Sequence, residues 1–391
     1  MTEWKEYKLG EIAEILDYKR KPLSSMERST RKGIYPYYGA SGIIDSIDDY
    51  IFDGEHILIS EDGENLRTRQ TPIAFLANGK FWVNNHAHIL KADYVHSRLI
   101  CYYFAQLDLN PYITGAVQPK LSQESLNRIP LYLPTLINER EKIVSILSSL
   151  DDKIDLLHRE NATLEQMAET MFRQWFVVER KEEWEEGKLG DYVIETVGGE
   201  WGKENPEGDF TKAVQCIRGT DIADLNVGLA SKTPIRFVKE SKFEKIEPRN
   251  GDIIMEISGG TENQSTGRVA YINEDVKTLF QYPIVFSNFC RLLRVDEKYS
   301  YFLYCYLKYL YDQDEYFNLE NGSSGIKNLD YKALLYDLTY PMPKDKRLIF
   351  EFNDNVSLYF KKINRNKQQI QTLIQTRDGL LPRLMSREIK I

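Results

Sequence analysis

A short segment near the start of this chain recurs near its middle. Trp4–Glu11 (WKEYKLGE) returns as Trp184–Asp191 (WEEGKLGD), with Trp, Lys, Leu, Gly and an acidic residue in the same order. The two segments lie 180 residues apart in a chain of 391. A repeat at that distance predicts two copies of one folding unit, each occupying about half of the chain.

Weaker correspondences follow the repeat in the same order. Their offsets grow along the chain: Gly54–Leu58 resembles Gly251–Met255 at 197, Asn84–Leu90 resembles Ser287–Leu293 at 203, and Leu121 and Leu126 resemble Leu329 and Leu334 at 208. An offset that only grows indicates that the second copy carries extra residues in its loops. Loops tolerate such insertions better than strands or helices do.

Each copy is followed by a long helical pattern. Between Ile143 and Trp175 the apolar residues are spaced alternately by four and three, which is a heptad seam with one polar member, Asn161. Residues 352–380 repeat the spacing less regularly, with Asn366 on the seam. The residues that we expect to pair the helices are Leu147, Leu150, Ile154, Leu157, Asn161, Leu164, Val356, Ile363, Asn366, Ile370 and Leu373.

Two arrangements fit these seams. Each helix could lie on its own domain, or the two helices could pack against each other. We favour packing, because the seams have similar lengths and each carries one polar residue that could contact the other. About 35 helical residues would span roughly 50 Å, which is long enough to act as a rigid spacer.

The rest of each copy alternates short apolar runs with turn formers. Tyr35–Gly42 and Ile57–Ile59 read as strands, whereas Arg98–Phe104 and Tyr299–Tyr311 read as helices with aromatic inner faces. The sequence therefore predicts an α+β domain over residues 1–135, a helical region over 136–180, a second α+β domain over 181–343 and a C-terminal helical region over 344–391.

Charge is distributed unevenly along the chain. The formal net charge is -8, yet residues 344–391 carry 11 basic and five acidic side chains, so everything before them is acidic. A DNA-binding function would thus need local basic surfaces or a basic partner. The four cysteines form no CxxC pair, which disfavours a zinc or redox site. Neither a long apolar stretch nor a signal-like start is present, and we expect a cytoplasmic protein.

Motifs for catalysis are incomplete. Asn110–Tyr112 lacks the second proline of an amino-methyltransferase motif, and no glycine-rich turn supports a cofactor there. Gly198–Lys203 resembles a phosphate loop, but its spacing is one residue short and Glu204 replaces the Ser or Thr that would bind magnesium. We read both as ordinary loop segments.

Possible metal ligands are equally sparse. His86 and His88 would share one face of a strand, but no cysteine or carboxylate follows at ligand spacing, so a structural or base-contacting role is favoured. Asp252 and Glu256 faintly suggest a nuclease, yet the expected lysine is missing. We therefore expect no metal site and no catalytic residue in this chain.

Six segments spread over the whole chain carry a family resemblance. They are Tyr35–Ile43 (YPYYGASGI), Gln118–Ser122 (QPKLS), Leu147–Ile154 (LSSLDDKI), Met171–Val177 (MFRQWFV), Gly251–Arg268 and Thr376–Ser386 (TRDGLLPRLMS). Together they resemble the specificity subunit of type I restriction-modification systems. The second domain has no evident counterpart of Tyr35–Gly42.

The resemblance implies an α+β fold with two tandem target recognition domains, residues 1–135 and 181–343, separated and followed by long helices that pair as an antiparallel coiled coil. It also implies a non-catalytic reader of a split double-stranded DNA target, which holds two modification subunits. Those partners would bind S-adenosylmethionine and methylate adenine, and up to two restriction subunits would use ATP and magnesium. The chain itself would hold no cofactor. A methylation-only or related phage-defence system fits the same features.

Base reading requires polar side chains on loops or strand ends, such as Arg for guanine and Asn or Gln for adenine. By that rule the candidates in the first domain are Tyr38, Ser41, Glu61, Asn65, Arg67, Arg69, Asn84, His86, Gln118 and Lys120. In the second they are Arg218, Thr220, Ser258, Asn263, Gln264, Thr266, Arg268, Ser323 and Lys327. Each could equally be an ordinary loop residue, and Tyr38 could be part of the core.

Two other functions remain open at this point. The chain could be a structural adaptor whose duplicated domains bind protein, which the absence of bound DNA and of a methyltransferase partner would indicate. It could also be an enzyme whose motif escapes detection, which turnover of DNA by the purified chain alone would reveal.

Overall fold

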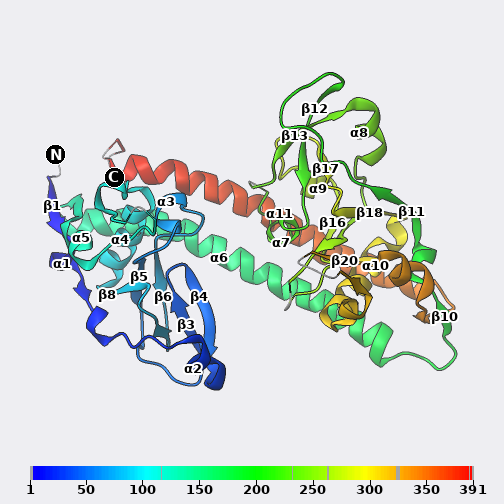
Figure 1. Cartoon of the computed structure of the whole chain (residues 1–391), viewed down its shortest axis with the longest axis horizontal. Helices are drawn as coiled ribbons and strands as arrows, with labels where there is room; N and C mark the ends of the chain where they lie inside the picture. The colour runs from blue at the N-terminus through cyan, green and yellow to red at the C-terminus, as the bar shows by residue number, and fades with distance from the viewer. Residues whose placement is uncertain are drawn as a thin grey trace. The chain divides into compact units, whose positions relative to one another are not determined.

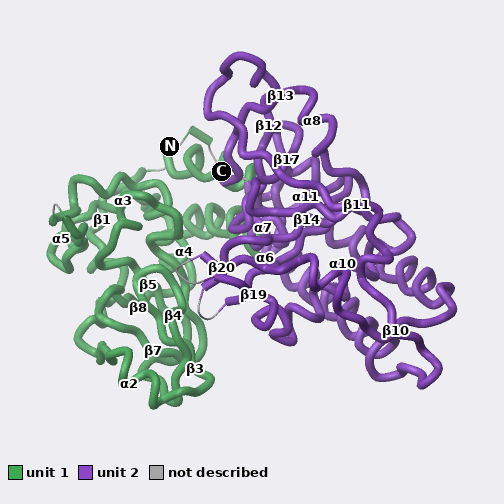
Figure 2. The backbone as a smooth tube through the Cα atoms, turned by 45° about the vertical axis from the view of Figure 1, so that its right-hand side comes forward, with its two compact units in different colours: residues 1–152, 375–391 green, residues 153–374 purple. Residues whose placement is uncertain are grey.

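The computed structural model describes residues 3–115, 117–230, 232–261, 264–322, 326–386 and 388–389. The chain divides into two compact units, which Figure 2 shows in different colours. Unit 1 comprises residues 1–152 and 375–391, and unit 2 comprises residues 153–374. Each unit thus contains one copy of the repeat and parts of both long helices.

Unit 1 contains a four-stranded sheet of order β2-β8-β5-β6, a three-stranded sheet of order β4-β3-β7 and the antiparallel pair β1-β9. The strands are β1 (Trp4–Lys8), β2 (Glu14–Ile15), β3 (Lys32–Gly39), β4 (Gly42–Ile47), β5 (His56–Ser60), β6 (Ala74–Ala77), β7 (Trp82–Val83), β8 (Ala87–Lys91) and β9 (Pro130–Pro134). The helices are α1 (Leu9–Ile12), α2 (Ser25–Thr30), α3 (Asn65–Thr68), α4 (Tyr94–Gln106) and α5 (Gln123–Arg128). Every residue of β5 is buried. Ile57 and Ile59 enter one core cluster and Leu58 the other, as expected for a strand covered on both faces.

Unit 2 repeats this plan with sheets of order β11-β18-β14-β16 and β13-β12-β17, the pair β10-β21 and an additional sheet β15-β20-β19. Its strands are β10 (Glu185–Gly187), β11 (Val193–Gly198), β12 (Phe210–Ile217), β13 (Ile235–Lys239), β14 (Ile253–Glu256), β15 (Ser258–Gly259), β16 (Val269–Tyr271), β17 (Ile284–Phe286), β18 (Cys290–Val295), β19 (Glu320–Asn321), β20 (Lys327–Leu329) and β21 (Tyr340–Met342). Its helices are α7 (Asp221–Asn226), α8 (Glu240–Ile246), α9 (Glu274–Lys277) and α10 (Glu297–Asp312). The helices α4 and α10 are both N-capped by an aspartate, Asp93 and Asp296, which satisfies amides that the first turn leaves unpaired.

Backbone hydrogen bonds define which residues of the two units are equivalent. In unit 1 the Glu61 amide donates to the His86 carbonyl at 2.9 Å, and in unit 2 the Ile257 amide donates to the Phe289 carbonyl at 2.9 Å. His86 and Phe289 are therefore equivalent, in agreement with the sequence offset of 203. A matching pair of bonds relates Leu121 to Leu329.

The offset of 197 between Gly54–Leu58 and Gly251–Met255 is wrong by one residue. Ile57 pairs with Leu90 across the sheet, and Ile253 pairs with Leu293. These partners are 203 residues apart, so Ile57 is equivalent to Ile253. Two short apolar runs can be aligned almost equally well with a shift of one residue. Their true alignment is set by the register with the neighbouring strand.

The missing counterpart of Tyr35–Gly42 is the end of β12. The Asn84 amide donates to the Tyr38 carbonyl at 3.0 Å, and the Ser287 amide donates to the Ile217 carbonyl at 2.9 Å, so Tyr38 is equivalent to Ile217. In unit 1, β3 turns tightly into β4, whereas in unit 2 a longer connection containing α7 joins β12 to β13. That insertion hides the correspondence in the sequence.

The repeated phrase has the same structural role in both units. Leu9 and Leu189 are completely buried in their respective cores. Glu11 and Asp191 each accept a hydrogen bond from the lysine amide three residues earlier, at 2.9 and 3.1 Å. The phrase therefore starts a short helical turn and anchors it to the core.

The two long helices are α6 (Ile137–Arg173) and α11 (Arg347–Met385), drawn in green-cyan and red in Figure 1. Within unit 2, the Asn366 side-chain amide donates to Asn161 Oδ1 at 2.9 Å. Within unit 1, Arg377 Nη1 lies 2.9 Å from Asp151 Oδ1. The later residue of α6, Asn161, therefore contacts the earlier residue of α11, Asn366. The two helices thus pair in antiparallel orientation.

Apolar seam residues surround these polar contacts. Ile154, Leu157 and Ile370 form one buried cluster in unit 2, against which Leu373 packs. Val356 and Ile363 lie in the large core of unit 2, with Leu164 packed against it, while Leu147 lies in the core of unit 1 and Leu150 is half-buried. The predicted fold class, two α+β domains with long helices that pair, is confirmed.

All four cysteines are free. Burial raises the pKa of each thiol, Cys101, Cys216, Cys290 and Cys305, to about 12. Over the described ranges, none of the helices combines the length and the apolar character that crossing a membrane requires.

Candidate nucleic-acid interface

In unit 1, Tyr38 and Ser41 lie where β3 turns into β4. The Tyr38 ring packs against Phe75 and Phe81, with ring centroids 6.0 and 5.5 Å away, and burial raises the pKa of its hydroxyl. Ser41 is exposed in the turn. Tyr38 supports the fold, and Ser41 is accessible to a ligand.

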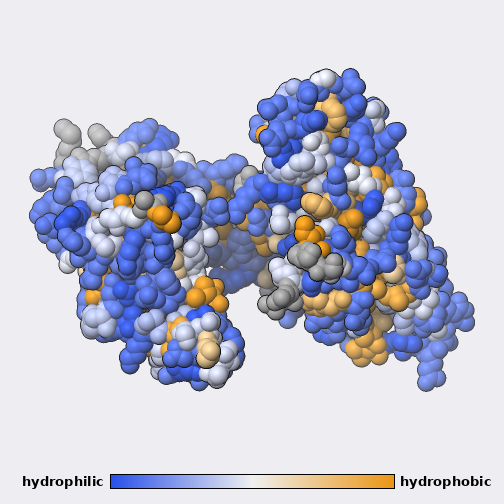
Figure 3. Space-filling view, viewed as in Figure 1, coloured by the Kyte–Doolittle hydropathy of each residue, from blue (hydrophilic) through white to orange (hydrophobic). Residues whose placement is uncertain are grey.

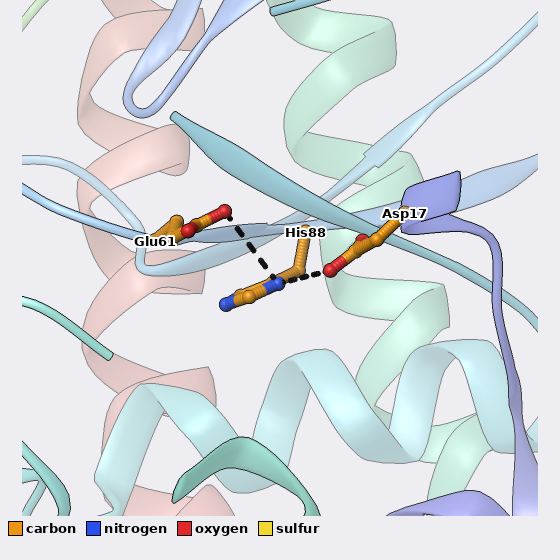
Figure 4. A group of neighbouring side chains, drawn as sticks. All are labelled: Asp17, Glu61 and His88. Atoms are coloured by element: carbon orange, nitrogen blue, oxygen red, sulfur yellow. Dashed lines mark hydrogen bonds and ion pairs between the residues drawn. The ribbon is translucent and has the colours of Figure 1, made fainter. Parts of the chain in front are cut away.

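Glu61 directly follows β5 and is part of a charge network. Its Oε2 lies 2.5 Å from Arg20 Nη1 and 3.8 Å from His88 Nδ1, and its Oε1 lies 3.2 Å from Lys120 Nζ. Asp17 Oδ2 lies 2.6 Å from the same His88 nitrogen. Figure 4 shows both carboxylates directed at that one ring nitrogen.

Neighbouring cations keep these carboxylates ionised. Burial alone would raise the pKa of Asp17, but the hydrogen bond and charge of His88, together with the Ile89 amide and Arg20, lower it below its usual range. Burial would also raise the pKa of Glu61, but contacts with Arg20, His88 and Lys120 outweigh it and lower the pKa of this carboxyl below its usual range.

Asp17, Glu61 and His88 also have the spacing of a three-ligand metal site. Arg20, however, contacts the same two oxygens that would bind the ion, Glu61 Oε2 and Asp17 Oδ2. The His88 Nε2 donates to the Leu121 carbonyl at 2.8 Å. A cation already occupies this place, so the geometry favours an ion-pair network over a metal centre.

Asn65, Arg67 and Arg69 mainly support the loop after β5. The Asn65 side chain exchanges hydrogen bonds with the backbone of Thr71, at 3.0 and 2.9 Å. The Arg69 guanidinium donates to carbonyls at the end of α4, including that of Ala105 at 3.0 Å. Arg67 is exposed, and its Nη2 donates to a backbone carbonyl at 3.1 Å.

Asn84 and His86 form the turn before β8. Asn84 is 7% exposed, and its Oδ1 accepts from the His86 amide at 2.8 Å. The exposed His86 ring lies 2.7 Å from Asp62. Gln118 and Lys120 are exposed on the loop that passes beside Glu61.

Unit 2 has an open cavity of about 840 Å³ at the corresponding strand ends. It brings together five of the predicted residues from two stretches of the chain, 218–220 and 258–268. Its lining comprises Trp201, Arg218, Gly219, Thr220, Glu256, Ser258, Gly259, Gly260, Thr261, Gln264, Arg268, Ser287, Asn288, Phe289 and Ile326.

Carboxylates hold the two arginines of this cavity. Arg268 Nε and Nη2 donate to both oxygens of the buried Glu256, at 2.9 and 2.8 Å, and these bonds raise the pKa of Arg268. Arg218 Nε and Nη2 donate to Asp221 at 3.0 and 2.7 Å. Fixed guanidinium groups of this kind present their remaining edge in one orientation.

The other predicted residues of unit 2 differ in exposure. Thr220 and Gln264 are exposed, Ser258 Oγ donates to Asn328 at 2.7 Å, and Thr266 is completely buried. Lys327 Nζ lies 2.8 Å from Glu320, outside the cavity lining. Asn263 and Ser323 lie outside the described residues.

Comparison with known families decides what kind of chain this is. A family model described as the type I restriction modification DNA specificity domain matches residues 1–166 and again residues 181–372. The chain belongs to the type I restriction-modification specificity family. The two matches follow the two copies of the repeat.

Individual members of the specificity family resemble different lengths of the chain. A putative type I restriction enzyme specificity subunit of Haemophilus influenzae is 36% identical over 150 residues, which are 38% of this chain and 37% of that protein. A type I specificity subunit of Methanocaldococcus jannaschii is 25% identical over 360 residues, 84% of this chain and 78% of that protein. The crystal structure of the S subunit from M. genitalium superposes with a TM-score of 0.58 at 16% identity, over 98% of this chain and 96% of that one.

The sequence did not predict the apolar residues that line the cavity of unit 2. Sequence reasoning searched for side chains that hydrogen bond to bases, and therefore passed over Trp201, Phe289 and Ile326. A signal was available, because the offset of 203 already aligned Phe289 with His86. It also missed Asp17 and Arg20, whose roles depend on contacts more than 40 residues away in sequence.

Proposed function

We propose that this chain is the DNA-reading subunit of a type I restriction-modification complex, and that each unit reads one half of a bipartite double-stranded target. The observation that carries the proposal is that the two units have the same arrangement of strands but different side chains at equivalent strand ends. His86 of unit 1 corresponds to Phe289 of unit 2, and backbone bonds of equal length place both. A shared scaffold with diverged loop ends is suited to reading two different sequences.

The polar groups at these strand ends match what base reading requires. In unit 2, Arg218 and Arg268 suit guanine, and Asn288 and Gln264 suit adenine. In unit 1, Ser41, His86, Gln118 and Lys120 are exposed. These residues remain candidates for individual base or phosphate contacts, together with the other predicted positions described above.

Charge supports a role for basic partners. The chain has a formal net charge of -8, so its overall charge does not favour binding to the phosphate backbone. Two modification subunits that bind S-adenosylmethionine would close around the duplex and supply much of that contact. Up to two restriction subunits, which use ATP and magnesium, would cleave the DNA. The present chain is the non-catalytic reader in this scheme.

The paired helices supply the spacing between half-sites. At about 1.5 Å per residue, the 37 residues of α6 span roughly 55 Å, which exceeds one helical turn of DNA at about 34 Å. A paired helix is stiffer than a loop of equal length. We therefore assign the length of the gap in the target to α6 and α11.

Co-expression with a type I modification subunit from the same genome tests this function. Sequencing that detects 6-methyladenine should reveal one motif made of two short blocks separated by a fixed gap. Cells that express the modification subunit alone are the control and should lack the motif. A chain that binds neither DNA nor the modification subunit would instead be a protein adaptor.

A further inference from the structure

Phe289 is a large exposed apolar residue in the lining of the unit 2 cavity. Its side chain is 56% exposed, although it lines the cavity together with arginines and amides. Scattered hydrophobic residues also occur elsewhere on the surface, as Figure 3 shows, and by themselves require no explanation. What distinguishes Phe289 is its place in a concave surface that also contains Arg218, Arg268 and the amide of Asn288.

The backbone holds this side chain in a defined position. The Phe289 carbonyl accepts from the amides of Ile257 and Ser258, at 2.9 and 3.2 Å. The next residue, Cys290, is completely buried at the start of β18 and pairs with Glu256 across the sheet. The phenyl ring therefore projects from a rigid strand end.

The equivalent position in unit 1 carries the opposite chemistry. His86 is held by the same backbone bond, but its ring Nδ1 forms a hydrogen bond with Asp62 Oδ2 at 2.7 Å. In unit 2, Ser258 is equivalent to Asp62 of unit 1. Each follows directly after the residue, Ile257 or Glu61, whose amide donates to the carbonyl of the turn. The apolar group is thus specific to unit 2.

Asn288 gives the apolar ring a polar neighbour. It is exposed, lies directly before Phe289 in the same turn and lines the same cavity. In the DNA major groove only thymine presents a methyl group, and its adenine partner presents the N6 and N7 pair that an amide recognises. One turn therefore carries an amide and an apolar ring, which are complementary to the groups that an A·T pair displays in the major groove.

We propose that Asn288 and Phe289 read one A·T base pair in the half-site of unit 2, with the amide on adenine and the ring on the thymine methyl group. This assignment rests on the proposed function and names a specificity determinant within it. The ring selects thymine by removing its methyl group from water. Burial of one such group corresponds to about a fourfold change in affinity.

Deoxyuridine tests the contact, because it differs from deoxythymidine only by the methyl group. Once the target is known, each thymine is replaced singly by uracil and binding to the complete complex is measured by fluorescence anisotropy. We expect one position at which uracil weakens binding about fourfold. In the Phe289→Ala complex thymine and uracil should bind equally at that position.

A parallel substitution tests the amide. Replacing the paired adenine by 7-deazaadenine removes the N7 acceptor, and this should weaken binding by the wild-type complex but not by the Asn288→Ala complex. His86→Ala is the matched control, since it alters the equivalent turn of unit 1. Whatever its effect on the half-site of unit 1, it should leave the difference between thymine and uracil at this position of the unit 2 half-site unchanged. Circular dichroism of each variant checks that the overall secondary structure is retained.

The outcomes separate the two proposals. If the wild-type complex binds its target but no thymine-to-uracil effect depends on Phe289, the base-pair assignment is wrong and the proposed function stands. A half-site free of A·T pairs, or an equal loss at every position in the Phe289→Ala complex, also overturns the assignment. If the complex binds no specific DNA at all, the proposed function itself fails.

Discussion

At the scale of single residues, one charge is buried in an unfavourable place. Lys367 on α11 is 7% exposed, and burial lowers the pKa of its ammonium group to about 8, an effect that nearby Lys308 reinforces and Glu165 opposes. Lys308, by contrast, lies 2.8 Å from Glu169. The loop at Gly228 passes directly against the Lys367 side chain, because a Cβ there would lie 2.8 Å from its Cγ.

Lys367→Met should therefore stabilise the protein at neutral pH. A pKa lowered from 10.5 to about 8 corresponds to about 3 kcal/mol of unfavourable burial at pH 7. Between about pH 8 and 10.5 the unfolded lysine keeps its proton and the folded one does not, so wild-type stability rises with pH. The difference between variant and wild type should shrink over that range in urea unfolding.

The matched control for this substitution is Lys361→Met, which changes an exposed lysine on the same helix. We expect it to alter the unfolding free energy by less than about 0.5 kcal/mol at every pH. Equal stability of wild type and Lys367→Met at pH 7, with no pH dependence of their difference, would show that Lys367 is not held as a buried cation.

At the scale of secondary-structure elements, the predictability of this fold depended on periodicity. The seam through Asn161 and the second seam through Asn366 were visible because each extends over many turns. The equivalence of β3 and β12 was not visible, because the insertion with α7 separates short strands of different composition. Register within a sheet is set by a neighbouring strand that lies far away in sequence.

The two seam asparagines should depend on each other. Asn366 donates to Asn161, while Asn161 Nδ2 is buried with no hydrogen-bond partner among the described residues. Asn366 Nδ2 also donates to Glu160 Oε2 at 2.9 Å. Asn161→Leu alone should still cost about 1–3 kcal/mol, because it removes the buried one of the two acceptors. The double variant with Asn366→Leu should recover most of that loss or exceed wild-type stability.

Urea unfolding of the four proteins of this double-mutant cycle measures the coupling directly. Asn355→Leu serves as the control, because Asn355 is exposed on α11 and bonds only locally to Glu351. Strictly additive effects of the two seam substitutions would contradict a shared buried hydrogen bond.

At the scale of the whole molecule, candidate residues divide into those that the fold uses and those that it leaves accessible. Sequence reasoning selected loop residues by their type and could not see their hydrogen-bond partners. Arg69 and Asn65 were chosen for their donors, which the structure directs at backbone groups of unit 1. Arg268 and Arg218 were chosen for the same reason, and a common cavity contains both.

Arg268 and Lys120 should affect DNA binding in different ways. Lys120→Ala should weaken binding to all sequences alike and reduce the salt slope by about one, because Lys120 is exposed and suited to a phosphate. Arg268→Gln should change the preference at one or two base pairs by about 1–3 kcal/mol. Binding of each complex to a library of target variants at several salt concentrations measures both effects.

The Glu256→Gln and Arg268→Gln double variant is the control for folding, because Arg268→Gln alone leaves Glu256 buried without its cation. If the double variant retains the wild-type sequence preference, Arg268 has only a structural role. A uniform loss for Arg268→Gln and a sequence-specific one for Lys120→Ala would reverse the two assignments.

The division of the chain into units also has a consequence for biosynthesis. Unit 2 is one continuous stretch, but the core of unit 1 includes Leu381 and Leu384 from the last turns of α11. The first-made part of unit 1 therefore lacks two leucines of its core until the end of α11 has been synthesised. During translation, unit 2 can fold while the core of unit 1 is still incomplete. Unit 1 is therefore the unit that would need protection from aggregation.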